Sequence, residues 1–382
     1  MTAKGGPLAG IKIIEMAGIG PAPMCGMLLS DLGAEILRID RPAQADVGIN
    51  RPLETNFILR GRNTIKLDLK QPDAVALVRR LVRQADALIE GFRPGVMERL
   101  GIGPDVCLKE NPRLIYGRVT GWGQNGRRSK TAGHDINYIA LTGALGHMGR
   151  KGEAPPIPLN LIGDFAGGAL FLAVGLLAGI IEARYSGQGQ VVDAAIVDGV
   201  ASMLTSINGL LTCGLFSPEP GTNILDSGAF YYDTYLCADG RYIAVGCIEK
   251  RFFAQFLELL GIDPSTMPPQ DDRDRWPEGR EQLRKLFLTR TRDEWAKLFE
   301  GTDACVTPVL SLSESFEDPH LRERGTYMVV GGYQQAAPAP RFSRTQPTMP
   351  SPPAPPASED ALRGWLSPQE IEALRSTGLL QS

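Results

Sequence analysis

The chain of 382 residues is poor in the residues that bind metals and form paired thiol sites. It has three histidines, His134, His147 and His320, which are too few and too scattered for a multi-histidine metal site, so we expect no metal. Its six cysteines contain no CxxC pair, and neither a zinc motif nor a thioredoxin-type motif is predicted. Scattered cysteines in a chain of this size indicate reduced thiols, and we expect a cytoplasmic location.

Targeting segments and blocks of like charge are also lacking. The first ten residues contain no apolar signal-peptide core, and the last four are not a peroxisomal address. A net charge of -3 without runs of one sign argues against nucleic acid or a membrane surface as the main partner. The uncharged stretch 165–181 has 17 residues, whereas a membrane-spanning helix needs about 20. We therefore expect a buried helix there, packed closely by its glycine and alanine residues.

The first 120 residues alternate between strand and helix patterns. The apolar β-type runs lie at 11–17, 35–40, 64–69, 87–92 and 113–123, with helical patterns at 23–34 and 73–85. This repetition predicts an α/β fold with a doubly wound, Rossmann-like parallel sheet. The first strand-to-helix turn has Gly18 and Gly20, but Pro23 stands where a dinucleotide motif needs its third glycine, which disfavours a dehydrogenase.

The second half of the chain differs from the first in its residue pattern and in its aromatic content. Residues 187–211 predict another strand-to-helix transition, and 227–253 are aromatic and alternate around an Ala-Asp-Gly turn, which predicts a β-hairpin. Helical patterns follow at 252–261 and 279–301, and the prolines of 336–358 predict an extended strap. Ser367 is predicted to cap a short helix at 367–378.

These patterns predict three parts. Residues 1–221 form the first part of a large domain, 222–325 form a smaller α+β domain, and 326–382 return as a strap that completes the large domain.

Three acid–base candidates stand out, each with a structural alternative. His134, in AGHDINY, has a reference pKa near ~6.5 and suits proton transfer, or it is a half-buried histidine bonded to its neighbours. Asp164 heads the apolar helix, where it is either an ordinary N-cap or first-turn residue or a carboxylate beside N–H groups that stabilise a developing oxyanion. Glu249 follows a strand and is otherwise a solvated turn carboxylate.

A family resemblance rests on motifs spread over residues 1–345. They are GIGPAP (18–23), LRIDRP (37–42), IKLDLK (65–70), IEGFRPGVMERLG (89–101), RLIYGRVTGWGQ (113–124), AGHDINY (132–138), PLNLIGDFAGG (158–168), GQVVDAAIVDG (189–199), FYYDTYLCADGRYIAVGCIE (230–249) and DACVTPVL (303–310). With the spacing of His134, Asp164 and Glu249, the chain resembles the family III CoA-transferases of the CaiB/BaiF type, and within them the racemase branch.

The resemblance implies a small-molecule acyl-CoA substrate, no cofactor beyond the CoA of the substrate, and an interlocked homodimer. Racemases of this branch interconvert (2R)- and (2S)-2-methylacyl-CoA thioesters. Carried over, His134 and Asp164 flank the reacting carbon, one removing its proton and the other returning one through an enolate, with donors at the helix start of Asp164 holding the enolate oxygen. Glu249 would tune these groups from the other subunit.

The resemblance also assigns substrate contacts. Those for CoA are Arg41, Leu67, Asp68, Leu69, Lys70, Gly91, Phe92, Arg93, Arg99, Gly133, Asp135, Ile136, Asn137 and Tyr138. Ser227, Phe230 and Lys250 depart from the usual racemase pattern near the acyl pocket, so the preferred acyl group stays open. Two alternatives remain: a CoA-transferase in which Asp164 is the nucleophile, forming a mixed anhydride and then an enzyme–CoA thioester, and a non-catalytic CoA-thioester binder.

Overall fold

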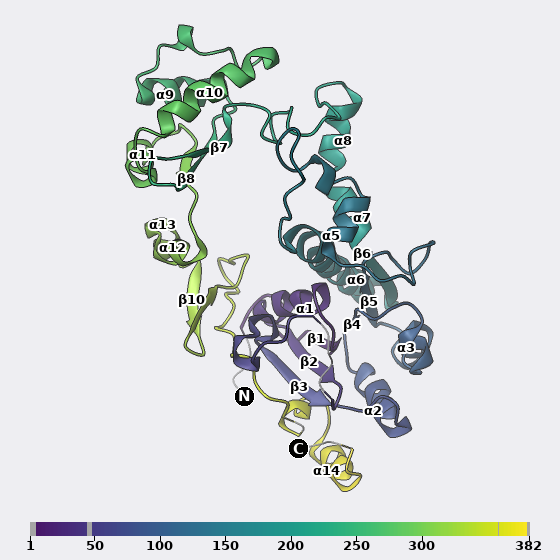
Figure 1. Ribbon diagram of the computed structural model, residues 1–382. Helices are drawn as coiled ribbons and strands as arrows, with labels where there is room; N and C mark the ends of the chain where they lie inside the picture. Colours follow the sequence, from purple (N-terminus) through teal and green to yellow (C-terminus); the bar gives the residue numbers. More distant parts are fainter. Residues whose placement is uncertain (1–4, 44–47, 358, 380–382) are drawn as a thin grey trace. The chain divides into compact units, whose positions relative to one another are not determined.

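The computed structural model describes residues 5–43, 48–357 and 359–379, which form two compact units (Figure 1). Unit 1 comprises Met1–Thr142, Pro158–Met203 and Arg324–Ser382, and unit 2 comprises Gly143–Ile157 and Leu204–Glu323. The expected smaller domain began at 222, whereas unit 2 begins at 204 and also takes in 143–157. The terminal residues 1–4 and 380–382, on which the targeting expectations partly rest, lie outside the described residues.

Unit 1 contains a parallel sheet of six strands. In chain order they are β1 (Lys12–Met16), β2 (Glu35–Asp40), β3 (Arg62–Lys66), β4 (Ala87–Glu90), β5 (Ile115–Thr120) and β6 (Gln190–Ala195). The spatial order β3-β2-β1-β4-β5-β6 reverses at β1, so the predicted doubly wound sheet is confirmed. Ligands of such folds bind beyond the carboxyl ends of the strands, which makes that edge the place to look for a site.

Helices and one hairpin complete unit 1. They are α1 (Pro21–Asp31), α2 (Pro72–Val82), α3 (Val96–Arg99), α4 (Pro104–Glu110), α5 (Asp135–Leu141), the π-helix η4 (Leu161–Leu170), α6 (Phe171–Ser186), α7 (Ile196–Met203), α14 (Pro368–Ser376), and the hairpin strands β10 (Tyr327–Val330) and β11 (Tyr333–Ala336). Helices α1, α2 and α4 each begin with proline, whose fixed φ suits a first helical position and whose missing N–H costs nothing there.

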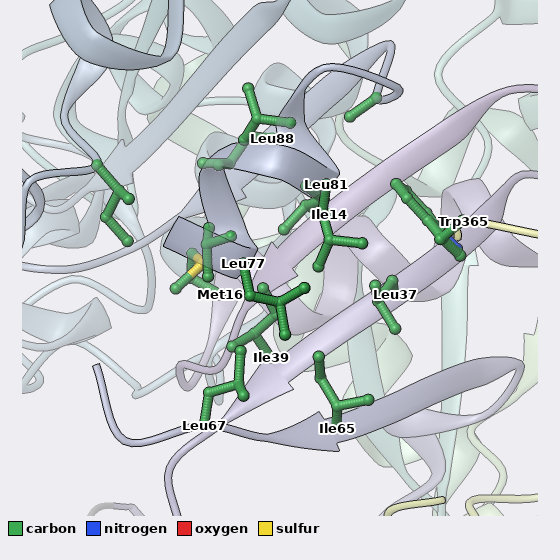
Figure 2. Close-up of a cluster of buried hydrophobic side chains, with 14 of the residues drawn as sticks. Ile14, Met16, Leu37, Ile39, Ile65, Leu67, Leu77, Leu81, Leu88 and Trp365 are labelled. Carbon is green, nitrogen blue, oxygen red and sulfur yellow. The ribbon is translucent and has the colours of Figure 1, made fainter. Parts of the chain in front are cut away.

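The strands of the sheet alternate between two apolar clusters. On one face the cluster includes Ile14, Met16, Leu37, Ile39, Ile65, Leu67, Leu77, Leu81, Leu88 and Trp365 (Figure 2). On the other, Ile13 and Ile36 pack with Leu172 and Leu176 of α6. The inner strands β1, β2, β4 and β5 are buried on both faces and largely apolar, whereas the edge strands β3 and β6 are partly exposed. Trp365 shows that the C-terminal segment completes the core of unit 1.

The apolar helix differs from its expected form. It runs from Leu161 to Ser186 and is the one described helix that is long and apolar enough to cross a membrane by length and composition, yet 44% of its most apolar stretch is buried. One side packs in the core, while Val174 on the other is 66% exposed. The expectation of a buried helix is therefore only partly correct for the single chain.

Unit 2 has an antiparallel sheet with helices around it. Its elements are α8 (Thr205–Thr212), β7 (Tyr232–Leu236), β8 (Tyr242–Gly246), α9 (Lys250–Leu260), α10 (Trp276–Phe287), α11 (Arg292–Phe299), β9 (Val306–Pro308), α12 (Leu312–Glu317) and α13 (Pro319–Glu323). The β7–β8 hairpin is confirmed. The helix predicted over 279–301 is two helices, because Thr291 and Glu294 form a reciprocal capping box that starts α11.

The C-terminal expectations agree with the structure. Residues 337–357 contain no helix or strand, as predicted for the proline-rich strap. Ser367 caps α14, because its side chain accepts a hydrogen bond from the N–H of Glu370 while Glu370 accepts one from the N–H of Ser367 at 2.6 Å.

Candidate active site

His134 precedes α5 directly, on the loop that follows the carboxyl end of β5. Its backbone is extended, and its N–H donates a hydrogen bond to Oδ1 of Asn137 at 3.0 Å. The side chain of His134 is exposed in the single chain, so the half-buried interpretation is wrong there. The capping bond fixes the backbone at His134 and leaves the imidazole accessible to a substrate.

Tyr138 fixes the conformation of the loop that carries Gly133 and His134 by packing and by a hydrogen bond. It packs edge-on against Trp122 with ring centroids 4.7 Å apart, and its hydroxyl donates to the carbonyl oxygen of Gly133 at 2.5 Å. Gly121 and Gly133 leave the space that the ring fills, since a Cβ atom at Gly121 would lie 2.0 Å from it. The glycines on either side of the loop are therefore needed for packing.

Asp164 is the fourth residue of the π-helix η4 and does not cap it. The cap position is held by Asn160, whose side-chain amide donates to Oδ2 of Asp164 at 3.4 Å. Gly20, at the start of α1, has φ of +66°, and a Cβ atom there would lie 3.1 Å from the same oxygen. The carboxyl of Asp164 thus lies against the first strand-to-helix turn. Asp164 is not the N-cap of η4, but it does lie in the first turn, as the structural alternative allowed.

Asp135 joins the two candidate acid–base residues. Its Oδ1 accepts a hydrogen bond from the N–H of Asp164 at 2.6 Å, and its carboxylate also accepts one from the N–H of Gly163. The N–H of Asp164 is one of the helix-start donors that were expected to hold an enolate oxygen, and Asp135 takes it. Since Asp135 follows His134 in the chain, the bond brings His134 and Asp164 to one place.

The electrostatics suit proton transfer at Asp164. Burial raises the pKa of the Asp164 carboxyl, and the negative charge of Asp135 raises it further, while the bond from Asn160 and the charge of His134 oppose the shift. A carboxyl with a raised pKa exchanges its proton closer to neutral pH than an ordinary aspartate does. Burial likewise raises the pKa of Asp135, although its two backbone hydrogen bonds oppose this.

The expected CoA contacts follow the carboxyl ends of neighbouring strands. Arg41 follows β2, residues 67–70 follow β3, 91–93 follow β4, and 133–138 lie on the connection after β5. Burial raises the pKa of Tyr138 to about 12, with the charge of Arg93 opposing, so the 91–93 turn lies near the 133–138 loop.

Not every expected contact has a free side chain. Leu67 is buried in the core, so it can meet a ligand only through its backbone, while Leu69 packs against that core and is partly exposed. The side chains of Lys70, Arg93 and Arg99 are exposed and remain candidates.

The remaining candidates belong to unit 2. Glu249 is exposed at the start of α9 and makes no side-chain hydrogen bond within the described residues, so the solvated-turn interpretation stays open. Lys250 is also exposed, whereas Phe230 is fully buried in the core of unit 2. Ser227, one of the three residues that depart from the usual racemase pattern, lines a cavity of about 590 Å³ within this unit.

Sequence reasoning missed two residues of the site. Asn160 was not singled out, although its spacing of four from Asp164 places two residues on one face of a helix. Gly20 was placed in an incomplete dinucleotide motif and in the family motif GIGPAP, but not at the acid–base site. Its positive φ and its contact with Asp164 depend on how α1 meets η4, which local patterns do not report.

Comparison with known proteins supports one family. The sequence profile of CoA-transferase family III matches residues 8–361. The chain is 42% identical over 380 residues to the α-methylacyl-CoA racemase of Mus musculus, covering 98% of both chains, and 42% identical over 333 residues to that of Homo sapiens, covering 87% of this chain and 85% of the other. A CaiB/BaiF family protein from Brucella suis has the same fold, with a TM-score of 0.79 at 24% identity over 98% of this chain and 99% of the other.

Across nearly its whole length, and with the site of His134 and Asp164 at the carboxyl edge of its parallel sheet, the chain belongs to CoA-transferase family III.

Proposed function

We propose that the chain is an α-methylacyl-CoA racemase that interconverts (2R)- and (2S)-2-methylacyl-CoA thioesters. The observation that carries the proposal is the 2.6 Å hydrogen bond between Asp135 and the N–H of Asp164, which joins an imidazole and a carboxyl in one site. A 1,1-proton transfer needs two such groups, because the proton must leave one face of the carbon and return to the other. The activity of the two mammalian relatives supports the same reaction.

His134 and Asp164 exchange roles with the direction of the reaction. A neutral His134 takes the α-proton while a protonated Asp164 supplies one, and in the reverse direction the ionised carboxylate is the base. The raised pKa of Asp164 favours this exchange because it makes the protonated, proton-donating form easier to reach than in an ordinary aspartate. A placed general base contributes about 10²–10⁴-fold to the rate.

Because the N–H of Asp164 is bonded to Asp135, the enolate oxygen needs other donors. The backbone N–H groups of Asp135 and Ile136 donate no hydrogen bond to any residue of the described ranges, and both follow His134 directly. They are the donors we assign to the enolate oxygen, where the loss of one donor costs about 10²–10³-fold in kcat. The carboxylate of Asp135 keeps the start of α5 against η4 while this oxygen is held.

The CoA moiety is held at the same edge of the sheet. Arg41, Lys70, Arg93 and Arg99 form no ion pair with any described residue, which leaves their charges for the phosphates of the substrate. The reaction needs no redox change, so no cofactor beyond the CoA of the substrate is required.

Two copies of the chain form the working enzyme in this proposal. The exposed apolar side chains of α6, among them Val174, Ile181 and Tyr185, support burial against a second copy. Glu249 would then reach the site from that copy. The test is complementation between two inactive variants, His134→Ala and Glu249→Ala, co-expressed so that mixed dimers form.

If Glu249 acts across subunits, each mixed dimer has one site with both residues intact, and about half of its sites regain activity. If Glu249 acts within its own chain, every site lacks one residue. Activity that stays at the level of the single variants therefore contradicts the shared site.

The reaction is tested with one epimer of a 2-methylacyl-CoA in D₂O. We expect racemisation with deuterium at C2, followed by chiral analysis and mass spectrometry. Transfer of CoA to a free carboxylic acid, with an enzyme adduct trapped by hydroxylamine, would instead identify a transferase using Asp164 as nucleophile. Binding of the thioester with neither event would identify a non-catalytic binder.

A further inference from the structure

A buried arginine outside the acid–base site bridges both ends of an expected CoA segment. The segment runs from Gly91 to Arg99, and a glutamate precedes each of these residues, Glu90 and Glu98. Arg118, on the neighbouring strand β5, donates to both glutamates. One guanidinium therefore ties together the two ends of the segment.

The bonds at the first end are short and enclosed. Glu90 has no solvent exposure; one carboxylate oxygen accepts from Nε of Arg118 at 2.7 Å, and the other accepts from the N–H of Phe92 at 2.7 Å. The carboxylate of Glu90 thus holds the turn that carries Arg93. Burial raises the pKa of Glu90, while the bonds from Phe92 and Arg118 oppose the shift and stabilise its charge.

At the second end, Arg118 reaches the surface of α3. Its Nη1 donates to Oε1 of Glu98 at 2.8 Å, and the side chain of Glu98 is 45% exposed. Burial alone would raise the pKa of Glu98, but the hydrogen bonds from Arg118 hold it below its usual value. Met97, fully buried beside Glu98, fixes the backbone of α3 to the core.

Arg93 and Arg99 differ from Arg118 in that both are exposed and neither forms an ion pair with a described residue. Arg118 therefore pairs with carboxylates, whereas the two arginines on the Gly91–Arg99 segment form no ion pair with a described residue. Fixing a binding segment before the ligand arrives removes part of the entropy cost of binding.

We infer that Arg118 is a positioning residue for CoA binding, holding Arg93 and Arg99 in place through Glu90 and Glu98. The inference rests on the proposed function, because it takes CoA as the ligand of the segment. A solely structural role does not need Glu98, since a half-exposed ion pair adds little to stability. The ion pair between Arg118 and Glu98 is explained if CoA binding depends on the positions of Arg93 and Arg99.

The test uses Glu98→Gln, which removes a charge from the bridge while leaving the buried pair of Arg118 and Glu90 intact. Its matched control is Glu110→Gln, because Glu110 forms a similar surface pair with Arg79 and Arg83 on another part of unit 1. The measurements on the full chain are the Kd for CoA by calorimetry, KM and kcat for a 2-methylacyl-CoA, and the midpoint of thermal unfolding.

For Glu98→Gln we expect Kd and KM to rise roughly tenfold, the size of one lost charge-assisted hydrogen bond, with kcat within about twofold of wild type. Glu98→Asp, which keeps the charge, should recover part of the affinity. The control should keep the wild-type Kd and unfold at the same temperature as Glu98→Gln.

Wild-type affinity in Glu98→Gln, or an equal loss of affinity in Glu110→Gln, overturns the role of Arg118 while the proposed function stands. A wild-type chain that neither binds CoA nor racemises a 2-methylacyl-CoA overturns both, so the two failures are distinguishable.

Discussion

The hydrophobic cores of the two units differ in composition. In unit 1, aliphatic side chains surround buried carboxylates such as Glu15, Asp31 and Glu90, each paired with an arginine. In unit 2 the interior is a cluster of aromatic rings that includes Phe256, which stacks on Phe299 with centroids 5.8 Å apart. Unit 1 thus fixes several charges in or beside its sheet, whereas unit 2 combines its aromatic core with one buried carboxylate, Asp233, which pairs with Arg150 and Arg280.

The difference between the two cores follows from a physical requirement of each unit: fixed charges in unit 1 and enough buried area for stability in unit 2. Buried ion pairs add little net stability because desolvation offsets their attraction, so their value in unit 1 is the fixed position of each charge. Aromatic rings bury a large area per residue, which suits a smaller unit with a short sheet. We therefore expect charge changes in unit 1 to damage catalysis and ring changes in unit 2 to damage stability.

The largest effect is expected from the acid–base pair of unit 1. Asp164→Asn and His134→Gln should each reduce racemisation by about 10²–10⁴-fold, because each removes one of the two proton carriers. The rates are measured from both epimers, with circular dichroism to check that the variants are folded. A full-rate Asp164→Asn enzyme would contradict the two-base mechanism.

The next effect concerns stability in unit 2. Phe256→Ala should lower the free energy of unfolding by about 3–5 kcal/mol, since it opens a cavity among stacked rings. Leu288→Ala, an exposed position of the same unit, is the control and should change stability by less than about 0.5 kcal/mol. Urea unfolding measures both. If folded Phe256→Ala lost as much kcat as Asp164→Asn, the expectation that ring changes in unit 2 act on stability and not on catalysis would be contradicted.

The smallest effect links stability to pH at Asp164. Its pKa is raised in the folded chain, chiefly by burial, so the ionised form destabilises the fold. This penalty is absent below the unfolded-state pKa of about 3.9 and fully present once the pH exceeds the folded-state pKa. Asp164→Asn should therefore be more stable than wild type at pH 7, with equal stability near pH 3, where the wild-type carboxyl is protonated in both states.

Thermal unfolding of both proteins across this pH range checks the prediction. A variant less stable than wild type at pH 7 would mean that the carboxylate of Asp164 stabilises the fold, in contradiction to its raised pKa.

Local sequence patterns determined most of the architecture. The apolar runs predicted β2 at its observed bounds and the other strands of the sheet within a few residues, because a parallel strand buried on both faces must be apolar. The turn of the β7–β8 hairpin and the Ser367 cap were equally local. His134 and Asp164 were found from residue type and motif, since proton chemistry restricts the choice of side chain.

Only the tertiary structure decided which groups meet. Asp135 takes the N–H of Asp164, Gly20 lies against the carboxyl of Asp164, and Arg118 joins Glu90 to Glu98. Each contact joins segments that are distant in the chain, so no local period or cap signal reports it. The surroundings that set the pKa of a carboxyl or the geometry of a binding segment therefore exist only once the sheet and its helices have packed.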